Sequence, residues 1–139
     1  MTKMTTIAKI IEAHGGLAAL KANYIRIEKA PYMPLVIEHI GDGPRGLPQV
    51  SVAHYGEQNG DAMRDPEMCF ELMGDDWGPT YFRNDYMGVE QFAAFKNEAG
   101  QAMIRPRLIK DLRSFARTWD RNIREQGFLE AYKSQKVVA

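Results

Sequence analysis

Apolar side chains near the N-terminus recur at the spacing of one helix face, at Ile7, Ile10 and Ile11. Thr6 stands just before them and is a residue type that caps helices, and the Gly-Gly pair at 15–16 suits a helix end. The pattern therefore predicts a first helix that ends at these glycines, followed by a short helical segment over 17–22.

The next stretch changes to the alternation that is typical of half-buried strands. Residues 24–28 and 35–40 alternate in this way, and Pro31 and Pro34 between them disfavour a tight regular hairpin. The glycine- and proline-rich segment 41–48 is predicted to be a loop that joins two elements.

Two further alternating runs flank the Asn-Gly dipeptide at 59–60, which tolerates the positive φ angles of a two-residue type I′ turn. A hairpin that reverses there places Tyr55 opposite Arg64 and His54 opposite Asp65. We therefore predict a β-hairpin in this region.

Regular pairing beyond that point would set Val52, a core candidate, against Glu67. A slip of one residue removes the conflict, because Met68 then faces Val52. A bulge at Asp65-Pro66 would supply the slip, since proline cannot donate to the ladder. We therefore predict that the ladder breaks near Pro66.

The C-terminal half is predicted to hold a loop over 74–79, strands over 80–84 and 86–92, and a long helix over 105–126. Pro106 suits the first position of that helix and Gly127 suits its C-terminal cap. Apolar side chains repeat along it at helical spacing, at Leu108, Leu112, Phe115, Trp119 and Ile123.

These elements predict an α+β fold. A single antiparallel sheet of four to six strands, in meander order from residue 24 to about residue 92, packs with an N-terminal helix and a long C-terminal amphipathic helix. At 139 residues the chain fits one domain, 1–139. A lone cysteine, Cys69, excludes an internal disulfide, and no signal peptide or membrane-spanning stretch is present, so we expect a cytoplasmic protein without membrane contact.

The formal net charge is zero, but the charges are unevenly distributed. Residues 55–90 hold nine acidic side chains against two basic ones, whereas residues 91–139 hold ten basic side chains against five acidic ones. Such polarity acts either within the fold or toward a partner.

His54 beside Asp65, with Glu57 nearby, is the candidate catalytic group, because a carboxylate can orient a histidine as a general base. No nucleophile accompanies the pair, so the alternative is a core histidine that a carboxylate or the backbone satisfies. Glu57, Asp61, Asp65 and Glu67 match no established metal-binding loop, and a solvated acidic rim is the simpler interpretation. We expect no metal and no cofactor.

Aromatic and charged side chains form a set of candidate binding residues. Tyr55 opposite Arg64 is a predicted cross-strand stacking pair. Trp77, in the predicted loop, belongs with Arg83 and Asp85 to a polar-aromatic concentration. Its aromatic side chains either form a recognition surface or pack the sheet against the helices.

The long helix carries cations that fall within about 80° of one another on a helical wheel, well away from its apolar stripe. They are Lys110, Arg113, Arg117, Arg121 and Arg124. Such a face would lie along the phosphates of a nucleic acid, or would pair with the acidic segment of this chain or of a second copy.

The motif HYGEQNGDAMRDPEM, with YIRIEKAPYMPLVIE before it and YFRNDYMGVEQ after it, resembles an uncharacterised family of small bacterial domains that occur in proteins of plasmids, phages and conjugative elements. The resemblance covers about residues 24–92. The family usually has a second aromatic residue after His-Tyr, whereas Gly56 stands here. The resemblance implies a fold core and a mobile-element origin, but no activity.

These features favour a non-catalytic interaction or accessory module that binds an unidentified protein partner. A homo-oligomer through the charge-segregated surfaces is one form of this interpretation. An enzyme that uses His54, Asp65 and Glu57 is one alternative, and a nucleic-acid-binding accessory protein that uses the cationic helix face is the other.

Overall fold

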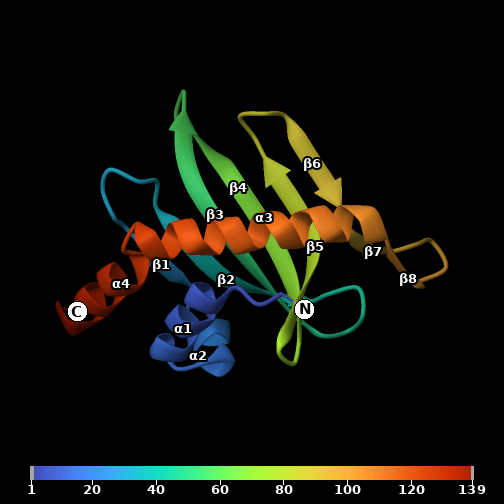
Figure 1. Cartoon of the computed structure of the whole chain (residues 1–139), viewed down its shortest axis with the longest axis horizontal. Coiled ribbons are helices and arrows are strands. Elements are labelled where there is room, and N and C mark those ends of the chain that lie inside the picture. The colour runs from blue at the N-terminus through green and yellow to red at the C-terminus, as the bar shows by residue number, and fades with distance from the viewer. Residues whose placement is uncertain (1, 139) are drawn as a thin grey trace.

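The computed structural model describes residues 2–138, which form four helices and eight strands (Figure 1). The helices are α1 (Thr5–His14), α2 (Leu17–Ala22), α3 (Pro106–Glu125) and α4 (Phe128–Val138). One antiparallel sheet contains, in sequence order, β1 (Ile25–Ile27), β2 (Leu35–Asp42), β3 (Pro48–Gln58), β4 (Asp61–Met73), β5 (Asp76–Asn84) and β6 (Val89–Phe92). A separate pair contains β7 (Ala94–Lys96) and β8 (Ala102–Ile104). The predicted α+β meander is confirmed.

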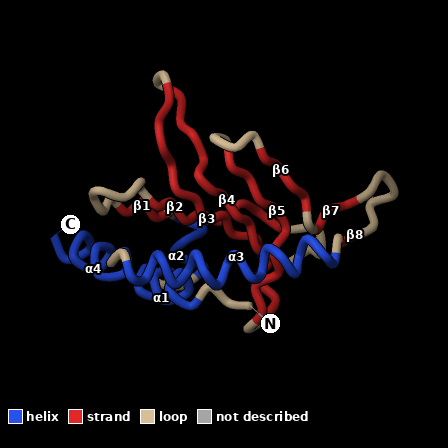
Figure 2. Tube along the Cα trace, turned by 45° about the horizontal axis from the view of Figure 1, so that its top comes forward, coloured by secondary structure: helices blue, strands red, loops and turns tan. Residues whose placement is uncertain are grey.

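The hairpin predicted at residues 59–60 is also confirmed. Asn59 has a φ of 53° and Gly60 a φ of 86°, which are the left-handed angles that a type I′ turn requires. Tyr55 pairs with Arg64 in the ladder below the turn. The β3–β4 hairpin projects beyond the rest of the sheet (Figure 2).

The ladder between β3 and β4 breaks where proline predicts it. Ala53 pairs with Glu67 while Tyr55 pairs with Arg64, so β4 holds one extra residue at Asp65-Pro66. Beyond this bulge the register is the predicted one, and the apolar side chains of both strands share one face.

All four helices lie on that face of the sheet, and α3 runs across the strands (Figures 1 and 2). Val50, Val52, Met68 and Phe70 are fully buried beneath the helices. The core they join includes side chains from every helix, among them Ile7, Leu20, Trp119 and Phe128. The opposite face of the sheet carries no helix within the described residues.

The N-terminus of α1 differs from the prediction. The helix begins at Thr5, so Thr6 lies inside it and does not cap it with its side chain. The cap is Asp120 of α3, whose Oδ2 accepts a hydrogen bond from the Thr6 N–H at 3.0 Å and whose Oδ1 accepts one from Ile7 at 3.2 Å. The carboxylate satisfies N–H groups that have no partner within the helix.

The predicted loop over 74–79 is wrong. β4 continues to Met73 and β5 begins at Asp76, so that only residues 74–75 form the turn. Pro79 is tolerated inside β5 because the ladder shifts beside it, between Cys69 and Phe70.

Other boundaries differ by smaller amounts. The predicted loop at 41–48 shrinks to 43–47, and the strand predicted at 86–92 shrinks to 89–92. The long helix ends as predicted before Gly127, which has a φ of 85°. Neither the β7–β8 pair nor α4 was predicted from the sequence.

Candidate functional site

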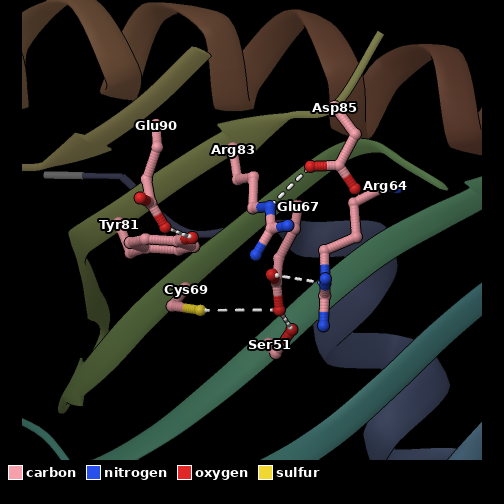
Figure 3. A network of polar contacts seen from close by, with 8 residues as sticks. All are labelled: Ser51, Arg64, Glu67, Cys69, Tyr81, Arg83, Asp85 and Glu90. Carbon is pink, nitrogen blue, oxygen red and sulfur yellow. Dashed lines mark hydrogen bonds and ion pairs between the residues drawn. The ribbon is translucent and has the colours of Figure 1, made fainter. Parts of the chain in front are cut away.

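Polar side chains gather on the face of the sheet that carries no helix. Because side chains alternate along a strand, Ser51, Glu67 and Cys69 point away from the core that their neighbours Val52 and Met68 enter. Figure 3 shows these three side chains together with polar groups from β5 and β6.

Glu67 is the centre of this network (Figure 3). Its Oε2 accepts a hydrogen bond from the Ser51 hydroxyl at 2.5 Å, and the Cys69 thiol lies 4.0 Å from the same oxygen. Arg64 Nε lies 3.0 Å from Oε1 as an ion pair, although its N–H does not point at that oxygen with hydrogen-bond geometry. The carboxylate is therefore already compensated by its neighbours.

A second part of the network lies on β5 and β6. The Tyr81 hydroxyl donates to Glu90 at 2.5 Å, and burial together with this carboxylate raises the pKa of Tyr81 to about 12. Arg83 Nε donates to Asp85 at 2.6 Å. The backbone N–H of Arg64 also donates to Asp85, and these bonds hold the pKa of that carboxyl below its ordinary value.

Two potential nucleophiles of this face, Ser51 and Cys69, are buried. Ser51 is 1% exposed and Cys69 is 4% exposed. Burial also raises the pKa of Cys69 well above its ordinary value, so the group is a thiol and not the nucleophilic thiolate. The network therefore links neighbouring strands, and it does not present Ser51 or Cys69 as an exposed nucleophile.

A groove of about 520 Å³, a volume within the range of ligand pockets, overlaps the network, because Glu67, Cys69 and Tyr81 also line it. Cys69 and Thr80 form its buried floor, and the Thr80 hydroxyl donates to Gln49 at 2.5 Å. Ile40 and Phe92 line its walls, yet they remain 41% and 49% exposed. This groove, defined by Ile40, Gln49, Cys69, Thr80 and Phe92 together with Asp42 and Lys96, is named the sheet groove.

Asp42 and Lys96 add opposite charges to the sheet groove. Both side chains are exposed, and neither forms a salt bridge with another residue in the described part of the chain. The groove therefore combines an apolar wall with an unpaired acid and an unpaired base.

His54 and Asp65 lie on the opposite face of the sheet, under the helices. The His54 ring packs 5.7 Å from Trp119 and 5.4 Å from Phe128, and its Nδ1 lies 3.0 Å from the Met33 carbonyl. Burial lowers the pKa of this histidine. Asp65 accepts a hydrogen bond from Asn84, also on the covered side. The cavity that His54 and Asp65 share is only about 160 Å³, which is below the size of ordinary ligand pockets.

The structure does not bring the other candidate catalytic group to that cavity. Glu57 lines a separate concavity on the projecting hairpin, together with Tyr55 and Arg26. Tyr55 also packs against Arg64, whose guanidinium carbon lies 5.7 Å from the ring centroid, as the predicted cross-strand pair requires. Arg83 lies on the uncovered face of the sheet.

The predicted acidic rim is only half correct. Glu57 and Asp61 are exposed. Asp65 and Glu67 are half-buried, and the bulge turns them toward opposite faces of the sheet. Asp65 accepts a hydrogen bond from Asn84, whereas Glu67 accepts one from Ser51 and forms an ion pair with Arg64. Their role is internal.

Gly56, the position that departs from the family pattern, lies beneath Tyr86. A Cβ at Gly56 would come within 2.4 Å of the Tyr86 hydroxyl and 3.2 Å of the Met33 sulfur. The Tyr86 ring therefore occupies the space that a side chain at position 56 would take.

The remaining candidate binding residues divide into buried and exposed ones. Trp77 is buried, with its ring 5.7 Å from Phe70, and packs the core. Arg113 of α3 forms a bidentate pair with Asp76 at 2.6 and 3.0 Å. The other four candidate cations on α3 are exposed: Lys110, Arg117, Arg121 and Arg124.

The sequence interpretation missed most of the uncovered face. Ser51, Thr80, Tyr81 and Phe92 were not singled out as site residues, and Cys69 was assigned to an apolar run with its neighbours. Strand alternation was the available signal for Ser51 and Cys69, because the predicted hairpin register already placed them on the face away from the core. No register was predicted for the strands that carry Thr80, Tyr81 and Phe92.

Within residues 2–138, no three His, Cys, Asp or Glu side chains gather in a way that would hold a metal ion. Across the same residues, no helix has the length and apolar character needed to cross a membrane.

Fold and site together define a class of protein: an α+β domain with helices on one face of a six-stranded meander and a polar, grooved opposite face. The chain belongs to the family described as a domain of unknown function, DUF6908, whose model matches residues 5–129. This match agrees with the expectation of an uncharacterised family, and it extends beyond 24–92 to include α1 and α3. No curated protein and no solved structure matches the chain.

Proposed function

We propose that the protein is a non-catalytic interaction module that binds a segment of a protein partner in the sheet groove, as an accessory protein of a mobile genetic element or a bacterial genome. The observation that carries the proposal is the groove itself, which has a buried floor, exposed apolar walls and unpaired charges.

The apolar walls supply the affinity in this proposal. Ile40 and Phe92 stand about half-exposed beside a buried floor, so a partner side chain placed between them would remove apolar surface from water. Large apolar side chains at the centre of a concave patch are the usual energetic anchors of protein interfaces.

In this proposal the charges of Asp42 and Lys96 set the orientation of the partner segment in the groove. A partner segment that carries a basic side chain would meet Asp42, and an acidic side chain on the same segment would meet Lys96. Because neither group has an ion-pair partner among the described residues, binding would not require an existing salt bridge to break.

The chemistry of the floor supports binding over catalysis. Cys69 is a buried thiol with a raised pKa, and the Thr80 hydroxyl donates its proton to Gln49. Neither group is activated for attack on a bound segment.

The test compares three versions of the tagged protein in capture from a nuclease-treated bacterial lysate. Wild type and a matched control, Met87→Asp on the exposed turn after β5, are expected to retain the same protein, because Met87 is 73% exposed and lies outside the groove. Phe92→Asp is expected to lose it. Equal capture by all three versions, or loss of the captured protein on nuclease treatment, would contradict the proposal.

A second measurement separates a partner from self-association. Sedimentation velocity of the purified wild type over a range of concentrations reports whether the groove is filled by a second copy. A dimer that Phe92→Asp abolishes would assign the groove to a homo-oligomer instead of a different protein.

A further inference from the structure

α3 carries two opposite faces. Leu112, Ala116, Trp119 and Ile123 are buried against the sheet. The exposed cations Lys110, Arg117, Arg121 and Arg124 fall within about 60° of one another, centred about 140° from the buried set, at 100° per residue. They span about 21 Å of helix at 1.5 Å per residue. These four residues are named the α3 cation row, and Figure 1 shows that no other element crosses in front of this helix.

The acidic segment of the same chain does not neutralise this row. Asp76 pairs with Arg113, which lies at the edge of the row. None of the four cations forms a salt bridge with another residue of the described part of the chain, and Arg117 makes only a 3.4 Å contact with the Thr2 hydroxyl. The acidic residues Asp111 and Glu125 of α3 lie about 40° or more outside the row.

The side chains beside the row distinguish between kinds of anionic surface. Ser114, Thr118 and Asn122 are exposed on one flank of the row, which also carries Asp111 and Glu125, and they can donate hydrogen bonds to phosphate oxygens. A helix that binds an anionic membrane needs an apolar face free to enter the lipid, but here that face is buried against the sheet. A narrow row of cations with hydrogen-bond donors along one flank instead matches one line of backbone phosphates.

We infer that the α3 cation row is a docking surface for the phosphate backbone of a nucleic acid. This site is separate from the sheet groove, because α3 and the groove lie on opposite sides of the sheet. Contacts to phosphates release counterions, so the affinity falls as the salt concentration rises. Four contacts predict that the logarithm of the binding constant falls against the logarithm of the salt concentration with a slope of about −3.6 for duplex DNA and about −2.8 for a single strand.

The experiment measures fluorescence anisotropy of labelled single-stranded and duplex DNA of about 20 nucleotides, between about 50 and 200 mM salt. Wild type is expected to lose about 100-fold in duplex affinity over this range. The variant Arg117→Glu/Arg121→Glu is expected to bind at least about tenfold more weakly, with a slope shallower by about 1.8. Phe92→Asp in the sheet groove is expected to bind as wild type.

The matched control is Lys21→Glu/Lys133→Glu, which changes the net charge equally at exposed positions of α2 and α4. It is expected to stay within about threefold of wild type, and circular dichroism verifies that both double variants are folded. Three results would overturn the inference. They are no binding of either DNA at about 50 mM salt, equal losses of DNA affinity in the two double variants, and binding of the wild type to polyglutamate or anionic vesicles but not to DNA.

Discussion

The carboxylate of Asp120 caps α1 by accepting hydrogen bonds from the backbone N–H of Thr6, 114 residues earlier in the sequence, at 3.1 and 3.0 Å. The acceptor is buried, and its negative charge sits at the positive end of the α1 dipole. One side chain of α3 therefore ties the N-terminal segment to the helical layer.

Replacement of Asp120 by alanine is expected to lower the free energy of unfolding by about 1–3 kcal/mol, because it leaves buried N–H groups of α1 without an acceptor. Urea denaturation measures the change. Asp111→Ala, an exposed position on the same helix, is the control and should stay within about 0.5 kcal/mol of wild type. Equal destabilisation by both substitutions would contradict the capping role.

Glu71 anchors the loop between β2 and β3. It is 0% exposed and accepts hydrogen bonds from the Arg45 guanidinium and the Arg45 backbone, both at 2.8 Å, and from the Leu47 backbone at 3.3 Å. Glu71→Ala is expected to cost about 3–5 kcal/mol of stability, since it strands a partly buried cation and two N–H groups.

The comparison for Glu71 is the exposed pair of Arg26 and Glu28, with a distance of 3.1 Å. Glu28→Ala is expected to change the free energy of unfolding by less than about 1 kcal/mol, because surface ion pairs contribute little. If the two alanine variants unfold at the same urea concentration, the loop is not held by Glu71.

His54 is expected to make stability depend on pH. Burial lowers its pKa in the folded protein, so the unfolded chain binds a proton below about pH 6.5 that the folded protein does not bind. The contribution of neutral His54 to the free energy of unfolding is therefore fully present above about pH 6.5, and it is lost as the pH falls toward the lower pKa of the folded protein. NMR of the ring Cε1–H should give a midpoint below 6.5, whereas a midpoint at or above 6.5 would show an accessible ring.

Cys69 is expected to react slowly with a thiol reagent such as Ellman's reagent at about pH 8, because it is buried and its raised pKa keeps it protonated. In urea the same thiol should react at the rate of a small-molecule cysteine, which serves as the reference. A native rate equal to the unfolded rate would show that the floor of the sheet groove opens.

Local signals in the sequence predicted the centre of the sheet. The Asn-Gly turn at 59–60 and the proline at 66 fix the register of β3 against β4, since each acts on the backbone of its own residues. The pairing of Val52 with Met68 follows from those signals together with the apolar pattern, which excludes Glu67 as the partner of a core valine.

Long-range contacts account for the features that the sequence did not predict. Thr6 is a good capping residue by type, but the distant Asp120 takes that role. Pro79 and the glycines around Trp77 are typical of a loop, yet pairing with β4 extends the strand through them. Cys69 points away from its apolar neighbours Met68 and Phe70, whereas composition alone groups the three together as one apolar run.

Every strand of the six-stranded sheet pairs with the strand before it, so each ladder closes over a short stretch of chain. The links between distant parts of the chain, Asp76 to Thr2 and Asp120 to Thr6, instead join the N-terminal segment to late elements. Short closures cost little chain entropy and form fast, whereas distant ones form after their ends have been brought together. The topology therefore favours an order of folding in which strand pairs form first around residues 59–60 and then toward both edges of the sheet, and in which α1 packs last.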